Sequence, residues 1–145
     1  MLKGIPSVIS PQLLQALAQM GHGDELVIAD GNFPCHSVGA NSIVVRADGH
    51  GVPQLLDAIL SLIPLDSYVE CPVALMQVVE GDSCGTPQIW QTYEELLAKH
   101  EPQHHDIEHM ERFAFYERAK NAFLIIATGE QAVYANILLK KGVIK

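Results

Sequence analysis

Apolar side chains recur at helical spacing in four stretches of the chain, which predicts four α-helices. The first helix is expected to begin after Ser10, a common N-cap residue, and to end at Gly21, because glycine readily adopts the left-handed conformation found after many helices. Pro64 is expected to stop the second helix, and Thr86-Pro87 to cap the third. The predicted helices are residues 11–20, 53–63, 89–97 and 112–121.

Shorter runs rich in Val, Ile and Leu predict six β-strands. Most of these runs do not alternate with polar residues, which is typical of strands buried on both faces of a sheet. The predicted strands are residues 26–29, 42–46, 73–79, 107–110, 123–128 and 136–139, and the polar segments 32–37 and 81–85 are expected to be loops. Alternating helices and buried strands predict one α/β domain across residues 1–145, with three α/β/α layers and a mostly parallel central sheet.

The charge balance narrows the range of partners. Nine Lys and Arg against 17 Asp and Glu give a formal charge of −8, which repels phosphate backbones and anionic lipids. We therefore expect neither nucleic acid nor membrane as a partner. The sequence has no apolar run of the roughly 18 residues that a membrane span needs, and its three cysteines lack CxxC spacing. These features predict a cytoplasmic protein with reduced thiols.

His22 and Asp30 are candidate site residues at the two ends of one predicted strand. Imidazole, with an unperturbed pKa near ~6.5, exchanges protons at neutral pH, and the glycines beside His22 leave room for a ligand. Asp30 follows the carboxyl end of the strand, where open α/β sheets place ligands. The alternative for His22 is a surface histidine in a turn, and the alternative for Asp30 is an ordinary acidic residue in a turn. On a straight strand the two would be separated, so both could reach one ligand only through a bend, a folded-back loop or a neighbouring subunit.

Two further segments suggest recognition of hydroxyl groups. The run 112–118 combines Arg112 with aromatic residues that include Tyr116, and an arginine can fork two hydrogen bonds to a pair of hydroxyls. The run Tyr134-Ala135-Asn136 offers a phenol and an amide. The alternative for residues 112–118 is a core helix with solvated arginines. The alternative for residues 134–136 is an ordinary turn.

A metal or thiol site is not favoured. His100, His104, His105 and His109 form two i,i+4 pairs, but Pro102 interrupts that helical spacing and no cysteine lies nearby. Adjacent residues such as Cys35 and His36 point apart in an extended loop, so they do not form a thiol–imidazole pair. The sequence therefore predicts no metal site.

Long, ordered motifs cover nearly the whole chain, namely residues 20–25, 29–30, 33–34, 46–49, 65–68, 112–119 and 134–142. Together they closely resemble the fucose branch of the family of D-ribose pyranase and L-fucose mutarotase. The resemblance implies that the protein interconverts the α and β anomers of L-fucose by acid/base ring opening and reclosure, without a cofactor. The alternatives are a non-catalytic sugar-binding accessory protein and a mutarotase for ribose or another monosaccharide.

The resemblance also assigns roles to residues. His22 matches the family's proton donor, and Tyr116 matches a tyrosine involved in proton transfer. Five residues match sugar-binding positions, namely Asp30, Arg112, Tyr134, Ala135 and Asn136. Arg112 matches an arginine of the fucose branch, where the ribose branch has a histidine. The resemblance further implies a ring-shaped homo-oligomer, such as a decamer, with sites near subunit interfaces.

Overall fold

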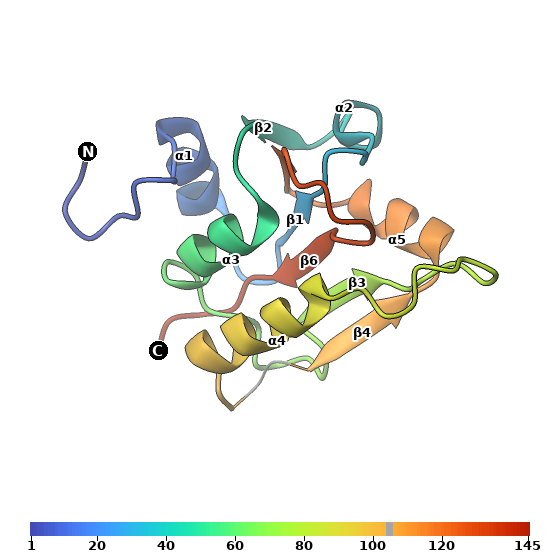
Figure 1. The fold of residues 1–145 in the computed structure, drawn as a ribbon. Coiled ribbons are helices and arrows are strands. Elements are labelled where there is room, and N and C mark those ends of the chain that lie inside the picture. The colour runs from blue at the N-terminus through green and yellow to red at the C-terminus, as the bar shows by residue number, and fades with distance from the viewer. Residues whose placement is uncertain (104–105) are drawn as a thin grey trace.

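The computed structural model describes residues 1–103 and 106–145 and contains one six-stranded sheet with helices on both faces (Figure 1). The strands are β1 (Glu25–Ala29), β2 (Ile43–Ala47), β3 (Val73–Met76), β4 (Ile107–Met110), β5 (Leu124–Thr128) and β6 (Ile137–Lys140). Their order across the sheet is β2-β5-β1-β6-β3-β4. β6 is antiparallel to both of its neighbours, whereas the other three strand pairs are parallel. The predicted α/β class with a mostly parallel sheet is confirmed.

The helices divide between the two faces of this sheet. They are α1 (Pro11–Gln19), α2 (Cys35–Val38), α3 (Val52–Leu60), α4 (Ile89–His100) and α5 (Arg112–Ala119). One hydrophobic cluster joins α1, α3 and α4 to one face, and a second joins α2 and α5 to the other. Successive residues of β1 alternate between the clusters, with Leu26 in the first and Val27 in the second. This is the period-two alternation expected of a doubly covered strand, and it confirms the three-layer prediction.

Helix termini account for several departures from the prediction. Ser10 caps α1 as predicted, with its hydroxyl accepting from the Leu13 N–H at 3.1 Å. The prediction that Gly21 ends α1 in a left-handed conformation is wrong, because Met20 is the C-cap in an extended conformation and the positive φ, 86°, occurs at Gly23. Thr86-Pro87 does not cap α4 either, whose N-cap is Gln88. A left-handed glycine is thus used in the turn into β1 rather than at the helix end.

Two predicted segments have different lengths or types. The third strand ends at Met76 rather than at Val79, so residues 77–79 belong to a connection that runs over the carboxyl end of the sheet. Part of the predicted loop 32–37 forms the one-turn helix α2. A single turn has too few residues to show helical periodicity in the sequence.

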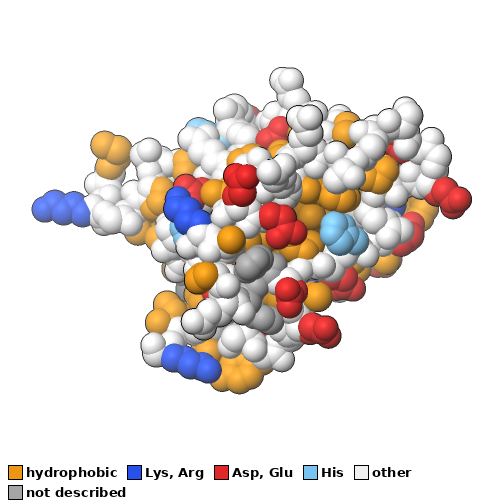
Figure 2. Space-filling model, turned by 60° about the horizontal axis from the view of Figure 1, so that its bottom comes forward, with side chains coloured by type: hydrophobic (Ala, Val, Ile, Leu, Met, Phe, Trp, Pro, Cys, Tyr) orange, Lys and Arg blue, Asp and Glu red, His pale blue; other side chains and the backbone are white. Residues whose placement is uncertain are grey.

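The surface is predominantly acidic, as the composition requires. Figure 2 shows acidic side chains spread over one face rather than gathered in a single patch. In the described part of the chain, no helix combines the length and apolar character needed to cross a bilayer.

Candidate active site

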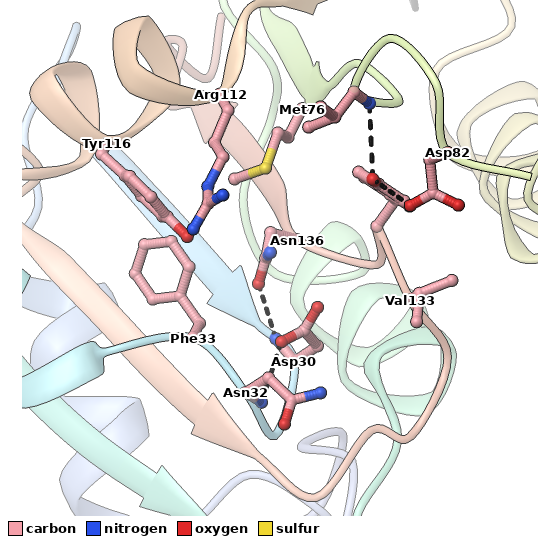
Figure 3. A pocket seen from close by; sticks show the side chains of 11 residues that line it. Asp30, Asn32, Phe33, Met76, Asp82, Arg112, Tyr116, Val133 and Asn136 are labelled. Atoms are coloured by element: carbon pink, nitrogen blue, oxygen red, sulfur yellow. Dashed lines mark hydrogen bonds between the residues drawn. The ribbon is translucent and has the colours of Figure 1, made fainter. Parts of the chain in front are cut away.

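A pocket of about 230 Å³ lies at the carboxyl ends of β1 and β3, beside the start of β6 (Figure 3). It is smaller than the roughly 300–1,000 Å³ pockets that hold drug-sized ligands, so it suits a molecule of monosaccharide size. The lining residues come from five separate segments and combine carboxylates, amides, one guanidinium and aromatic rings: Asp30, Asn32, Phe33, Met76, Val79, Asp82, Arg112, Tyr116, Val133, Tyr134 and Asn136.

The floor of the pocket is a hydrogen-bonded pair from neighbouring strands. Asp30 follows β1 and Asn136 precedes β6, and the Asp30 N–H donates to the Asn136 Oδ1 at 2.7 Å. The Asp30 carboxylate accepts from the Asn32 N–H at 3.0 Å. Burial raises the pKa of Asp30, although backbone N–H groups, first that of Asn32, partly offset the effect. A half-desolvated carboxyl of this kind is suited to accept a proton or a strong hydrogen bond from a ligand.

One wall is formed by α5. Arg112 and Tyr116 are four residues apart and therefore lie on the same face of the helix, with the guanidinium carbon 5.6 Å from the centre of the Tyr116 ring. The Tyr116 ring packs against Phe33, with centroids 5.4 Å apart. In Figure 3 the Arg112 guanidinium points down into the pocket, beside the end of the Tyr116 side chain. Among the residues that the structure describes, it has no hydrogen-bond or ion-pair partner, so its donors are available to a ligand.

The helix that carries this wall is fixed at both ends. The Glu111 carboxylate caps α5 by accepting from the N–H groups of Phe113 and Ala114 at 2.9 and 3.0 Å, and these bonds lower its pKa. Toward the other end, the Arg118 guanidinium donates to both carboxylate oxygens of Glu25 in β1. A bidentate pair fixes geometry as well as charge. The position of Arg112 and Tyr116 relative to β1 is therefore set by hydrogen bonds outside the pocket.

The opposite wall consists of the turn before β6 and the loop after β3. Tyr134 lines the pocket and its hydroxyl donates to Asp82 Oδ2 at 2.6 Å. Ala135 does not line the pocket, since it is fully buried and its carbonyl accepts from the Tyr93 hydroxyl at 2.7 Å. Figure 3 places Asp82 and Val133 across the pocket from Arg112 and Tyr116.

His22 lies elsewhere, before the amino end of β1, whereas Asp30 follows the carboxyl end. Five strand residues span about 16 Å, so one chain does not bring His22 and Asp30 together. The imidazole is 45% exposed, with its Nε2 3.1 Å from Asp66 Oδ1 and its ring centre 5.4 Å from that of Tyr68.

Asp66 determines which nitrogen of His22 faces outward. Burial opposes ionisation of Asp66, but the Tyr68 N–H and His22 outweigh it and lower the pKa of Asp66. An ionised carboxylate only accepts, so the Nε2 of His22 carries the hydrogen and donates it to Asp66. The Nδ1 of His22 is then the nitrogen that remains for a ligand.

Sequence reasoning therefore anticipated Asp30, Arg112, Tyr116, Tyr134 and Asn136 in one pocket, and missed several of the residues that surround them. The other lining residues are Asn32, Phe33, Met76, Val79, Asp82 and Val133. Met76 and Asp82 could have been proposed from the sequence. Met76 ends a buried strand and Asp82 lies in the loop that follows, at the edge of the sheet where α/β folds bind ligands.

The histidines considered for a metal have other partners. The Nε2 of His100 lies 2.7 Å from Asp57 Oδ1, and the His109 ring packs on Trp90 with centroids 5.0 Å apart. His104 and His105 lie outside the described residues. Across residues 1–103 and 106–145, no group of three His, Cys, Asp or Glu side chains is arranged to hold a metal ion. Cys35 is buried, and burial raises the pKa of its thiol to about 11, which disfavours a nucleophilic role.

Comparison with known proteins relates this geometry to a family. A model of the RbsD / FucU transport protein family matches residues 3–144. The fucose mutarotase of Mus musculus is 54% identical over an alignment of 145 positions, which covers 97% of this chain and 94% of the mouse protein. The crystal structure of FucU from Bifidobacterium longum covers 99% of this chain and all of its own, with a TM-score of 0.95 and 56% identity. The fucose mutarotase of Streptococcus pneumoniae, solved in complex with L-fucose, has a TM-score of 0.91 and 49% identity over 99% of this chain and all of its own.

Proposed function

The chain belongs to the RbsD / FucU family, and on that premise we propose that it is an isomerase that interconverts the α and β anomers of L-fucose. The observation that carries the proposal is the pocket in which Asp30, Asn136 and the Arg112 guanidinium converge beside the rings of Phe33 and Tyr116. Polar groups at one end suit the hydroxyls of a sugar, and aromatic faces suit its C–H side. Arg112 supports fucose over ribose because it matches the arginine of the fucose branch, where the ribose branch has a histidine. Its guanidinium can donate to two adjacent hydroxyls at once.

Mutarotation requires two proton transfers and no change of oxidation state. A base removes the proton of the anomeric hydroxyl while an acid protonates the ring oxygen, and the bond between the anomeric carbon and the ring oxygen breaks. The open-chain aldehyde turns about its C1–C2 bond and recloses on its other face, which returns both protons. Each transfer by a positioned group contributes typically ~10²–10⁴-fold. Side chains that exchange protons are sufficient for this chemistry.

We assign the acid to His22 and the transfer at the anomeric hydroxyl to Tyr116, directly or through a water. Asp30, Arg112, Tyr134 and Asn136 hold the sugar, and the Ala135 backbone sets the position of the residues on either side of it. The pocket geometry supports the binding roles. The acid is the imidazolium form of His22, which carries a second proton on Nδ1 while Nε2 still donates to Asp66. Because β1, about 16 Å long, separates His22 from Asp30, the acid has to come from a second copy of the chain.

A site shared between subunits agrees with the exposed aromatic residues near its two halves. Tyr68 packs beside His22 and is 65% exposed, whereas Phe113 follows Arg112 near the pocket and is 66% exposed. Exposed aromatic residues of this size are typical of protein interfaces. We propose that the surface around His22 and Tyr68 docks on the surface around Phe113 of a neighbouring copy in a ring-shaped homo-oligomer. Each pocket then receives His22 from its neighbour. The three free cysteines support a reducing, cytoplasmic location.

Exchange NMR on L-fucose at anomeric equilibrium tests the proposed activity. Saturating the α-anomer signal should reduce the β-anomer signal only when the protein is present, and D-ribose should show a much weaker effect. Saturable fucose binding without any transfer of saturation would instead identify a sugar-binding accessory protein. Exchange of ribose at the rate of fucose would refute the role given to Arg112.

A further inference from the structure

Tyr134 has a backbone conformation that the fold must hold in place. Its φ is 54°, and it is the only non-glycine residue in the described part of the chain with a positive φ. The left-handed region costs a residue with a bulky side chain free energy, so such conformations persist only where the surroundings over-determine them. At this residue the conformation places a phenol on the pocket wall.

Helix α4 holds the backbone of this turn through two aromatic side chains. The indole N–H of Trp90 donates to the Tyr134 carbonyl at 2.8 Å. One helical turn later, the Tyr93 hydroxyl donates to the Ala135 carbonyl at 2.7 Å, and Tyr93 is fully buried. Consecutive carbonyls are thus bound by donors from one rigid element. These bonds offset the cost of the left-handed residue between β5 and β6.

The phenol of Tyr134 is held from the other side by the loop after β3. Its hydroxyl donates to Asp82 Oδ2 at 2.6 Å and accepts from the Val79 N–H at 3.3 Å (Figure 3). The hydrogen bond lowers the pKa of Asp82 and raises that of Tyr134, so the proton stays on the phenol and points at the carboxylate. A hydroxyl has one donor and two acceptor positions. With its donor bound by Asp82, the Tyr134 hydroxyl can only accept a hydrogen bond from a ligand in the pocket that it lines.

We propose that Trp90 and Asp82 are positioning residues of the sugar site, which together fix Tyr134 as a hydrogen-bond acceptor for one sugar hydroxyl. The inference rests on the proposed function and extends it to residues outside the matched sugar-binding positions. Trp90 sets where the backbone places the phenol, and Asp82 sets which way the phenolic proton points. A sugar with a hydroxyl donor beside the Tyr134 oxygen gains this hydrogen bond, whereas a deoxy analogue lacks it.

The test compares three substitutions with a control in the wild-type background, using exchange NMR at several fucose concentrations to separate KM from kcat. Asp82→Ala and Trp90→Phe each remove one hydrogen bond to Tyr134. Either variant should raise KM about 3- to 10-fold and change kcat less than KM. Asp82→Asn retains an acceptor for the phenol and should restore most of the affinity. Gln91→Ala, next to Trp90 on the exposed side of α4, should behave as wild type.

A spectroscopic readout accompanies the kinetics, because Trp90 is the chain's single tryptophan. Titration of L-fucose should change its emission, and Asp82→Ala should shift the midpoint to higher fucose concentration by the same factor as KM. Asp82 is exposed, so its replacement leaves the core intact, and circular dichroism checks this. Unchanged KM in both Asp82→Ala and Trp90→Phe, with an active wild type, overturns the positioning role alone. An inactive wild type overturns the proposed function instead.

Discussion

The imidazole of His22 and the carboxylate of Asp66 form a pair in which Nε2 lies 3.1 Å from Oδ1, with Asp66 almost wholly buried and His22 half exposed. The Tyr68 N–H donates to the same carboxylate oxygen at 3.0 Å and fixes its orientation. An exposed histidine would otherwise sample several rotamers. The pair therefore presents one defined nitrogen, Nδ1, toward whatever docks on this surface.

Replacement of this carboxylate should affect catalysis more than binding. In Asp66→Asn the amide can accept from His22 or donate to it, so the ring loses its fixed hydrogen position. We expect kcat for fucose exchange to fall about 10- to 100-fold, with KM changed little, since the sugar-binding side chains lie elsewhere. Exchange NMR gives both parameters. A fall in affinity with an unchanged kcat would show that Asp66 contributes to binding instead.

The same carboxylate makes stability depend on pH in a predictable direction. The pKa of Asp66 is lower in the folded protein, so its contribution is present above the ordinary carboxyl pKa near ~4 and is lost as the pH falls through the lowered value. Thermal melts should show Asp66→Asn less stable than wild type at neutral pH, with the gap closing in acid. A constant gap across that range would contradict the linkage.

Asp30 should show the opposite dependence. Burial raises its pKa, so its ionised form costs stability, and the stability present below pH ~4 is lost as the pH rises through the raised value. Asp30→Asn keeps the acceptor for the Asn32 N–H and should equal or exceed the wild-type melting temperature at neutral pH. Its fucose affinity should fall more than about 10-fold. Loss of stability together with affinity would show that the carboxylate is structural.

Arg112 should govern the choice of sugar. In Arg112→His the forked donor is lost, and we expect the KM for L-fucose to rise about 10-fold while the ratio of ribose to fucose exchange increases. Arg112→Lys is the matched control that keeps the charge without the fork, and it should also lose affinity for fucose. An unchanged preference between the two sugars in Arg112→His would remove Arg112 as the determinant.

Tyr93 should contribute measurably to stability. Its hydroxyl satisfies the buried Ala135 carbonyl, and Tyr93→Phe leaves that acceptor without its partner at nearly unchanged side-chain volume. The free energy of unfolding should fall by about 1–3 kcal/mol. Urea denaturation with an unchanged m-value measures this difference. Stability equal to wild type would mean that the carbonyl finds another donor.

Several features of the fold were predictable because they depend on local patterns. Ser10 caps α1, and the unbroken apolar run before Asp30 forms the central strand β1. The antiparallel direction of β6 was not predictable, since a four-residue buried run has the same composition in either direction. The extent of β3 was overestimated because Val78 and Val79 resume the apolar pattern after Gln77, and Val79 lines the pocket.

The candidate site was predictable only in part. Tyr134 and Arg112 were identified by resemblance, because a turn and a polar helix start have no distinctive periodicity of their own. Asp66 lies in the matched motif 65–68, but neither its role nor that of Trp90 was predictable. Their relation to His22 and Tyr134 arises from contacts across 44 positions of the chain in both cases. The separation of His22 from Asp30, in contrast, followed directly from the length of one strand.

Subunit complementation is the most direct measurement of the central claim, that each site combines Asp30 of one copy with His22 of another. His22→Ala should abolish anomer exchange of L-fucose but still bind the sugar. At fucose concentrations near the wild-type KM, Asp30→Asn should lose most exchange through its weakened binding. Co-expression of the two variants should restore exchange at roughly a quarter of the sites, those that combine an intact His22 with an intact Asp30. Inactive mixed oligomers, shown by native mass spectrometry to contain both variants beside an active wild type, would contradict the shared site.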